Sequence, residues 1–292
     1  DADEENREVL FPYLNGEDLN SRPDCSAARW VIDFGERSEG EASQYSLPWL
    51  HVVETVYPIR ATKDANKYPR MVNEWWKFWN PRQGMRKLIA NVPQMLAVAR
   101  VSNTTMPVRV STDQIPSEQI IVFATTSFAD QAVLSSNIHH IWVMKHASTI
   151  GVGAGTRYTP TDVFDTFPRP AASDDLAELG EALDVRRREV MLRRKLGLTS
   201  LYNLVNNPDL TQDPDINRIR ELHVDIDDAV MAAYGWNDVS LGHGFHLYRQ
   251  FKRFTVSASA RVEITDRLLE ENHRRGGVGS EDVAEAQEDL FS

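Results

Sequence analysis

An arginine that follows several glycines and precedes a tyrosine stands in the stretch GAGTRYTPTDVFDTFPRP, residues 153–170. The guanidinium of Arg157 carries a planar fork of donors that can read a guanine through two hydrogen bonds. The glycines before it would let the backbone approach a partner closely, and the two prolines at the end stop any helix or ladder. Two interpretations follow. Either the stretch presents Arg157 to base edges in a nucleic-acid groove, or it is a tight turn in which Arg157 pairs with a carboxylate such as Asp162.

A second set of residues has the chemistry for binding phosphates. Three tryptophans, Trp75, Trp76 and Trp79, are interleaved with cations in NEWWKFWNPRQGMRK, residues 73–87. Tryptophan is costly to expose, so three together favour a core wall and leave the cations to face outward. Cations on one face attract nucleic acid without reading its sequence, and the alternative is a solvated basic face. The predicted phosphate contacts are Lys77, Arg82, Arg86, Lys87, Arg100, Asn103, Arg109, Lys145 and His146.

The distribution of charge predicts a local basic surface on an acidic chain. The net charge of the 292 residues is −11, which taken as a whole argues against a nucleic-acid binder. Residues 51–120, however, carry 10 Lys and Arg against 5 Asp and Glu, whereas residues 171–292 carry 15 against 23. A basic segment between acidic flanks is typical of a phosphate-binding surface.

Signatures of catalysis and of metal binding are missing from the sequence. It contains no GxxxxGK[ST] loop, no HExxH and no GxSxG, and GVGAG (151–155) lacks the spacing and the following helix of a dinucleotide fingerprint. No carboxylate stands at a supporting distance from His139, His140 and His146, which we interpret as lying along a partly exposed helix face. We therefore predict no catalytic residue and no metal site. The single cysteine, Cys25, and the lack of a run of ~20 apolar residues predict a cytoplasmic protein with no membrane partner.

Hydrophobic patterning predicts the elements that would position these residues. Before residue 170, β-branched runs predict strands among helices, and Ser127 is the expected N-cap of one long helix that reaches residue 148. After residue 170 helical periodicity dominates, with Ser173 and Asp213 as expected N-caps. We predict a mixed α+β (α/β) domain at 1–170 followed by a small all-α helical domain at 171–292. The predicted strands are 29–34, 95–102, 106–111 and 119–126, and the last predicted helix is 261–275.

Several of these stretches occur in the order of a known family. The chain resembles the target-recognition domain and helical C-terminal domain of MmeI-like, type IIL restriction-modification proteins. The resemblance covers nearly the whole chain, and its motifs are fairly specific as a series. They are LFPYLNGEDLNSRPD (10–24), WVIDFG (30–35), WWKFWNPR (75–82), LSSNIHHIW (134–142), RYTPTDVFDTFPRP (157–170) and AAYGW (232–236).

This resemblance implies DNA target recognition within a larger enzyme. Members join a nuclease, a helical connector, an adenine-N6 methyltransferase, a target-recognition domain and a helical C-terminal domain, and this chain resembles the last two. The implied partners are double-stranded DNA and the methyltransferase domain of the same polypeptide. S-adenosylmethionine and Mg²⁺ are expected only in parts of the parent outside this chain. The implied base-reading positions, beside Arg157, are Thr149, Gly153, Ala154, Gly155 and Thr156.

The base-reading stretch is smaller and richer in glycine than in members that carry charged side chains there. A different function also remains open at this point. The acidic helical half could be the docking surface of a protein-interaction or scaffolding module in a phage-defence methyltransferase complex. Salt-sensitive binding to duplex DNA favours the first function, and capture of a partner protein without DNA favours the second.

Overall fold

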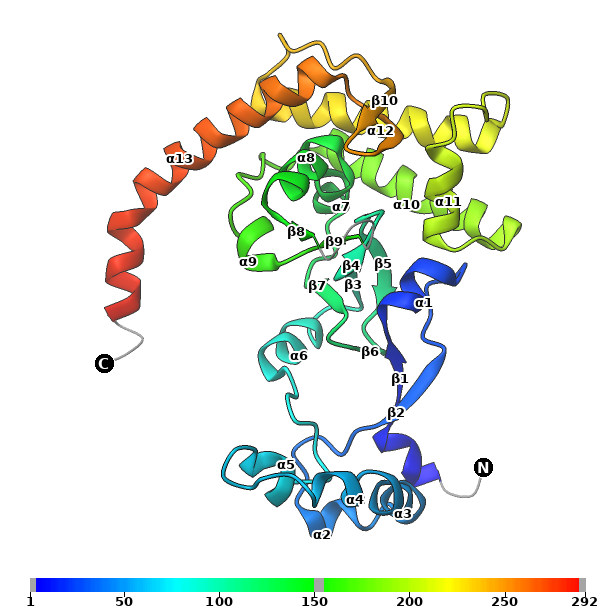
Figure 1. Cartoon of the computed structure of the whole chain (residues 1–292), viewed down its shortest axis with the longest axis vertical. Helices are drawn as coiled ribbons and strands as arrows, with labels where there is room; N and C mark the ends of the chain where they lie inside the picture. The colour runs from blue at the N-terminus through cyan, green and yellow to red at the C-terminus, as the bar shows by residue number, and fades with distance from the viewer. Residues whose placement is uncertain (1–3, 150–154, 289–292) are drawn as a thin grey trace.

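The structure is a computed structural model that describes residues 4–149 and 155–288 (Figure 1). It is an elongated molecule with a small helical lobe at one end, a helical layer at the other, and short β-sheets between them. Helix α13 (Ala258–Glu288) begins in the helical layer and extends away from the body. Where the structure describes the chain, no helix is both long enough and apolar enough to cross a membrane.

The strands of the N-terminal half form three small sheets, in line with the predicted α+β class. The most buried sheet has the antiparallel order β5-β3-β7, and a second has the order β2-β1-β6. The third, β4-β9-β8, is built from two-residue strands. The strands are β1 (Leu10–Leu14), β2 (Arg29–Ile32), β3 (Gln94–Ala99), β4 (Val101–Ser102), β5 (Val108–Ser111), β6 (Ile115–Pro116), β7 (Ile120–Phe123), β8 (Ser148–Thr149) and β9 (Thr156–Arg157). The short helices beside these sheets are α1 (Gly16–Ser21), α6 (Gln83–Ile89) and α9 (Pro160–Val163).

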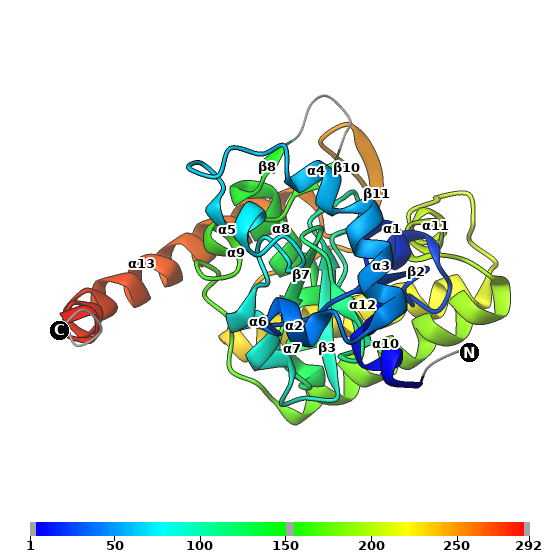
Figure 2. The same ribbon diagram turned by 90° about the horizontal axis from the view of Figure 1, so that it is seen from below.

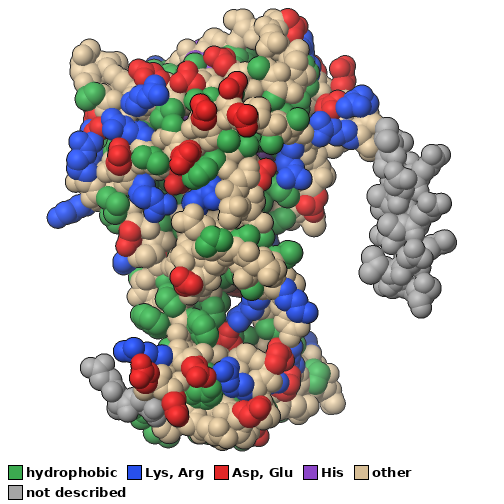
Figure 3. Space-filling view, turned by 180° about the vertical axis from the view of Figure 1, so that it is seen from behind, with side chains coloured by type: hydrophobic (Ala, Val, Ile, Leu, Met, Phe, Trp, Pro, Cys, Tyr) green, Lys and Arg blue, Asp and Glu red, His purple; other side chains and the backbone are tan. Residues whose placement is uncertain are grey.

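A separate aromatic lobe, defined here as residues 33–80 with the 3-10 helix η1 (Glu4–Val9), has its own hydrophobic cluster. Trp75 is 9% exposed, lies 5.0 Å from the ring of Trp49 and packs beside Phe34 and Val52. The predicted core wall is therefore confirmed for Trp75, whereas Trp79 is 42% exposed. Figure 3 shows the molecule narrowing between this lobe and the body, with acidic and basic side chains interspersed on the face in view. The helices of the lobe are α2 (Glu39–Ala42), α3 (Ser46–Thr55), α4 (Tyr57–Arg60) and α5 (Pro69–Asn73).

The long helix predicted from Ser127 is two helices, α7 (Phe128–Ser135) and α8 (Asn137–His146). Ser127 is the N-cap as predicted, since its side chain accepts from the amide of Asp130. Ser136 then interrupts the helix because its backbone is extended (φ −71°, ψ 155°) and its hydroxyl accepts from the amide of His139. A serine that caps a new helix competes with continuation of the old one, and the expectation of a single helix was wrong.

The C-terminal half is mainly helical, as predicted. Ser173 caps α10 (Asp174–Arg194), and Asp213 caps α12 (Pro214–Tyr234), whose C-terminus ends at Gly235 in the left-handed conformation. The predicted all-α domain also contains a β-hairpin, β10 (Gly244–Tyr248) and β11 (Phe251–Thr255), which an all-α prediction does not include. The remaining helices are α11 (Leu198–Val205) and α13, which continues beyond the predicted residue 275.

The predicted boundary at residue 170 does not separate two cores. One buried hydrophobic cluster contains Leu96 and Trp142 from before the boundary and Leu183, Ile226 and Leu268 from after it. Helix α10 packs closely on α7, and α12 packs on α10. The body therefore behaves as one packed unit across residue 170, and the domain boundary itself stays a prediction.

Candidate nucleic-acid interface

The Arg-Tyr step orients its two side chains in opposite directions. Thr156 in β9 is buried, with its hydroxyl 3.6 Å from Sδ of Met144, and Tyr158 has no exposed surface. Successive side chains of an extended segment point to opposite faces, so Arg157 between them is exposed. The step thus projects a guanidinium outward from a backbone that is anchored on both sides.

Two contacts anchor Tyr158 in the interior. Its amide donates to the carbonyl of Arg100 at 2.8 Å, and its hydroxyl lies 3.2 Å from Nε2 of His139. His139 is 2% exposed, and its Nδ1 lies 3.0 Å from the carbonyl of Leu134. Burial lowers the pKa of His139 to about 4 and raises the pKa of Tyr158, so both side chains are neutral near pH 7. His139 is therefore a buried anchor and does not line a partly exposed helix face.

Arg157 occupies the middle of the exposed row of the β4-β9-β8 sheet. In register it lies between Val101 of β4 and Ser148 of β8, and all three side chains are exposed. Among the described residues, no carboxylate lies within 4.0 Å of its guanidinium, and Asp162 contacts Thr161 instead. The tight-turn interpretation, in which Arg157 pairs with Asp162, is not supported by this geometry.

Gly155, two residues before Arg157, adopts a backbone conformation that favours glycine. Its φ is +98°, and a Cβ there would lie 3.4 Å from Oδ1 of Asn103 and 3.5 Å from Cγ1 of Val101. The backbone of Thr149 lies in β8, across from Thr156. Gly153 and Ala154, and the side chain of Thr149, lie outside the described residues. Thr156 is described, and its buried hydroxyl does not face the surface.

Two predicted phosphate contacts pair with carboxylates of the aromatic lobe, Lys77 from within the lobe and Arg86 from α6 of the body. Lys77 is 9% exposed and its Nζ lies 2.8 Å from Glu74 and 3.7 Å from Glu36. Arg86 forms an ion pair with Asp33, whose side chain is 5% exposed. Since their charges are neutralised by carboxylates, these two residues are structural in this fold.

Two further predicted contacts bind the protein's own backbone and amides. The guanidinium of Arg109 is buried, stacks 4.2 Å from the ring centroid of Phe128 and donates to Oε1 of Gln131 at 3.1 Å. Arg82 donates to the carbonyls of Ser117 and Pro116, and burial lowers its pKa. Arg109 is withdrawn from the surface and the half-buried Arg82 donates to the protein's own carbonyls, which corrects the expectation that all the cations share one face.

The other predicted phosphate contacts are accessible. Lys87, Asn103 and Lys145 are exposed, while Arg100 and His146 are half-buried. Asn103 and Lys145 belong to the surroundings of Arg157, because Asn103 adjoins Gly155 and Lys145 ends the helix that precedes β8. The ring of His146 packs 4.0 Å from that of Trp142. The structure therefore keeps a smaller basic set around Arg157 than the sequence predicted.

Cations of the β10–β11 hairpin join this set and had been missed. Nη2 of Arg253 donates to the carbonyl of Asn103 at 3.1 Å, and Nη2 of Arg249 donates to the carbonyl of Met144 at 2.6 Å. The segment YRQFKRF (248–254) interleaves aromatic residues with cations, as residues 73–87 do. That pattern could have revealed the hairpin, but the acidic average of residues 171–292 concealed it.

The FPRP segment provides carbonyls that the C-terminal helices bind. The hydroxyl of Tyr234 donates to the carbonyl of Pro168 at 2.8 Å, Asn272 donates to the carbonyl of Thr166 at 2.6 Å, and Arg275 donates to that of Arg169 at 2.7 Å. Proline lacks an amide hydrogen and breaks helices and ladders, so carbonyls of this segment are left for such contacts. The abrupt stop in the sequence is thus a joint between the two halves of the chain.

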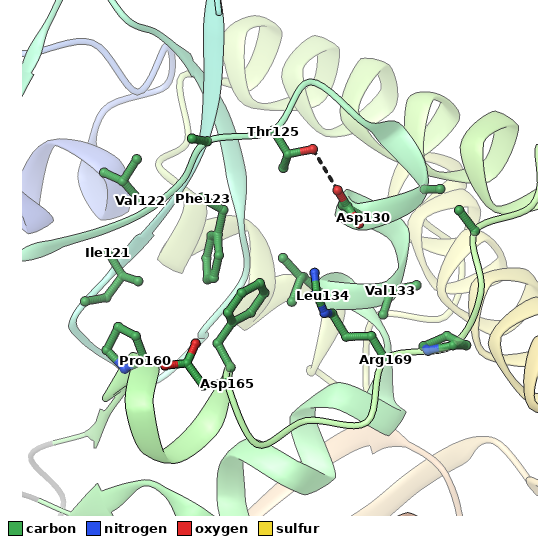
Figure 4. A pocket seen from close by; sticks show the side chains of 15 residues that line it. Ile121, Val122, Phe123, Thr125, Asp130, Val133, Leu134, Pro160, Asp165 and Arg169 are labelled. Atoms are coloured by element: carbon green, nitrogen blue, oxygen red, sulfur yellow. Dashed lines mark hydrogen bonds between the residues drawn. The ribbon is translucent and has the colours of Figure 1, made fainter. Parts of the chain in front are cut away.

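A cavity of about 390 Å³ lies beside this joint (Figure 4). Ile121 and Phe123 from β7 and Leu134 from α7 form its apolar wall, and Asp165 and Arg169 come from the segment after α9. The guanidinium of Arg169 stacks 4.6 Å from the ring centroid of Phe164. In the described part of the chain, no three His, Cys, Asp or Glu residues are grouped to hold a metal ion, here or elsewhere.

Comparison with solved structures shows the same fold in a larger protein. The chain is similar to the type IIL restriction-modification enzyme MmeI, solved in complex with DNA, with a TM-score of 0.63 and 14% identity over 93% of this chain. This chain spans 32% of that one. No curated protein sequence matches the chain.

The comparison with family models gives a match to the MmeI target recognition domain over residues 1–171, which include every predicted base-reading and phosphate-contact residue. The chain therefore belongs to the MmeI target recognition domain family.

Proposed function

We propose that this chain recognises a specific sequence of duplex DNA for a type IIL restriction-modification enzyme. The observation that carries the proposal is the placement of Arg157 in a chain of this family. Its guanidinium is exposed, no described carboxylate neutralises it, and it projects from the middle of the β4-β9-β8 sheet. An arginine fixed in this way can donate two hydrogen bonds to O6 and N7 of a guanine in the major groove.

The residues around Arg157 divide between reading and positioning. Arg157 reads base edges in this proposal, whereas the buried Thr156 beside it does not. Lys145 and Asn103 lie beside Arg157 and contact phosphates, and Arg100 and Lys87 add positive charge. Burial lowers the pKa of His146, so this residue contributes a neutral donor near pH 7. Phosphate contacts fix the register of a protein on the duplex but carry no sequence information, whereas base contacts specify.

The rest of the enzyme supplies the chemistry in this proposal. The methyltransferase, and a nuclease where the parent has one, belong to parts outside this chain, together with S-adenosylmethionine and Mg²⁺. The chain spans about a third of the MmeI enzyme, which leaves room for such domains in a parent of similar size. Docking of the duplex on this chain would place one adenine for flipping into the methyltransferase pocket.

Selection from a randomised duplex pool tests the proposal. The wild-type chain is expected to enrich a defined motif. Arg157→Ala is expected to relax the preference at one base pair by about 1–3 kcal/mol and to leave the other positions intact. Lys87→Ala removes the same charge from an exposed site in α6, and it is the matched control that weakens all sequences alike.

Two outcomes would contradict the proposal. If the wild-type chain enriches no motif under conditions where it binds duplex DNA, it does not recognise sequence. If Arg157→Ala and Lys87→Ala change affinity by the same factor for every sequence, Arg157 acts as a phosphate contact and not as a base reader.

A further inference from the structure

The β10–β11 hairpin has two faces with different surroundings. Its strands pair with Tyr248 opposite Phe251 and with Leu247 opposite Lys252, so only Arg249 and Gln250 form the turn. Because side chains alternate along each strand, Arg253 shares a face with Tyr248 and Phe251. Lys252 lies on the other face, with the exposed Leu247.

The face that carries Arg253 is turned toward the β4-β9-β8 sheet. The ring centroid of Tyr248 lies 5.8 Å from that of His140 and 4.6 Å from the guanidinium carbon of Arg261. Arg253 donates to the carbonyl of Asn103, and Arg249 donates to the carbonyl of Met144. These contacts attach the hairpin of the C-terminal half directly to the residues that surround Arg157.

The contacts of Asn103 and Met144 establish how close the hairpin comes to Arg157. Asn103 is two residues beyond Val101, the register partner of Arg157, which amounts to about 7 Å along an extended strand. On its other side, Asn103 adjoins Gly155. Figure 2 shows β8 and the hairpin on the same side of the molecule. A DNA major groove is about 12 Å wide, so phosphates that border a groove occupied by Arg157 come within reach of the hairpin.

The cations of the hairpin lack a carboxylate partner among the described residues, and Arg249 is exposed while Arg253 is half-buried. Among the described residues, no carboxylate lies within 4.0 Å of Arg249, Arg253 or Arg261, although Asp266 lines the adjoining hollow with Lys145 and Arg261. The same acidic half pairs most of its other arginines with carboxylates, as Arg194 with Asp213 and Arg267 with Asp238, both at 2.6 Å. The exceptions are the buried Arg187 and Arg220, which donate to carbonyls. Burial, together with the positive charges of Arg253 and Arg249, lowers the pKa of His140 to about 3. Unpaired positive charge in an acidic domain attracts a polyanion.

The turn holds an arginine where glycine is favoured. The φ of Arg249 is +54°, a conformation that L side chains rarely adopt and that hairpin turns normally assign to glycine or asparagine. A glycine would relieve the strain but would remove the guanidinium from the tip. The sequence therefore keeps a cation at the tip in spite of the backbone cost.

We propose that the β10–β11 hairpin binds the phosphate backbone of duplex DNA through Arg249 and Arg253, beside the groove that Arg157 faces. This inference rests on the proposed function and adds a partner surface outside the matched family range, which ends at residue 171. The hairpin and the β4-β9-β8 sheet then contact adjacent parts of one duplex. Lys252 does not take part, because it points to the opposite face of the hairpin.

Salt-dependent binding of a fluorescent mixed-sequence duplex of ~30 base pairs to the 292-residue chain tests this proposal. Arg249→Gln and Arg253→Gln are each expected to weaken binding and to reduce the slope of log K against log salt by about 0.9, the value for one lost phosphate contact. Lys252→Gln makes the same charge change on the same hairpin and is expected to keep the wild-type slope. Arg253→Lys keeps the charge and is expected to restore the slope, which a purely structural role of Arg253 would not predict.

Three other outcomes would each overturn the proposal. If Arg249→Gln and Arg253→Gln match Lys252→Gln in slope, the hairpin does not contact phosphates. If they change the motif enriched in the selection experiment and leave the slope unchanged, the hairpin reads bases, which also overturns the proposal. If the wild-type chain shows no salt-dependent binding to the duplex, the proposed function fails and this inference fails with it. Thermal unfolding of every variant identifies any that lost affinity by losing the fold.

Discussion

The position of Arg157 depends on residues that never reach the surface. Tyr158 and Thr156 are buried on either side of it, and the hydroxyl of Tyr158 lies 3.2 Å from the buried Nε2 of His139. A rigid donor loses little freedom on binding, so this anchoring would increase both affinity and specificity. The interior contact and the surface contact belong to consecutive residues, which explains why an arginine and an aromatic residue stand together.

Removal of the Tyr158 hydroxyl tests the anchor. Tyr158→Phe leaves a buried ring nitrogen of His139 without its partner, so we expect the free energy of unfolding to fall by about 1–3 kcal/mol. Urea unfolding measures this difference. Tyr57→Phe is the matched control because Tyr57 is 46% exposed, and it should change the free energy by less than about 0.5 kcal/mol. Similar small losses in both variants would show that the hydroxyl of Tyr158 contributes little.

Among the elements, α10 and α7 pack so closely that one position requires glycine. A Cβ built on Gly180 of α10 would collide with the carbonyl oxygen of Phe128, whose carbonyl carbon is 2.8 Å away, at the start of α7. The close approach joins the helix that follows residue 170 to α7, which is followed by α8 and then by the β8 strand beside Arg157. It is one reason why the two halves of the chain form a single packed body.

Gly180→Ala is therefore expected to destabilise the protein even though alanine favours helices. Overpacking against backbone cannot be relieved by rotation of a side chain, and we expect a loss of about 3 kcal/mol. Gly84→Ala in α6 is the control, because nothing lies within 4 Å of its Cβ position. That variant should be neutral or stabilising by up to about 1 kcal/mol. Relative to wild type, the free energy of unfolding should fall for Gly180→Ala and stay the same or rise for Gly84→Ala, and a neutral Gly180→Ala would contradict the packing argument.

Local chemistry made several elements predictable from the sequence. The caps at Ser127, Ser173 and Asp213 were identified because a capping side chain bonds an amide only two or three residues away. The predicted strands were identified from runs of β-branched residues, which are also a local feature of the sequence. The fold class and the exposed Arg157 also agree with what the residues indicated.

Long-range contacts account for what the sequence did not reveal. Arg109 reads as a surface cation on an exposed strand, but Gln131 and Phe128 from a distant helix enclose it. Arg86 likewise finds Asp33 more than fifty residues away. Neither partner can be inferred from spacing in the sequence. The sequence therefore predicted more phosphate contacts than the structure leaves exposed. The hairpin cations were missed for the opposite reason, because charge averaged over a whole domain hides a local excess.

At the scale of the whole molecule, folding keeps buried histidines of the body neutral. His139 and His223 are 2% and 5% exposed, and burial lowers the pKa of each to about 4. In the unfolded chain both titrate near 6.5. Above pH ~6.5 neither state binds these protons, so folding carries no penalty there. As the pH falls from about 6.5 toward 4, the unfolded chain gains protons that the folded protein refuses, and stability is lost.

The free energy of unfolding is therefore expected to decrease steeply between pH 6 and about 4.5, by about 3 kcal/mol per pH unit for the two histidines together. Carboxylates contribute little in this window. Arg194 lowers the pKa of Asp213 to about 2 and Arg274 lowers that of Glu271 to about 2, so the stability that these ion pairs contribute is lost mainly as the pH falls from about 4.5 toward 2, below this window. Urea unfolding at a series of pH values measures the slope. His139→Gln should reduce it by about 1.4 kcal/mol per pH unit, while His51→Gln, at an exposed site, should leave it unchanged. A wild-type stability that stays constant from pH 7 to 5 would mean that these histidines are protonated in the folded protein, and that the interior beneath Arg157 is more open to water than the structure shows.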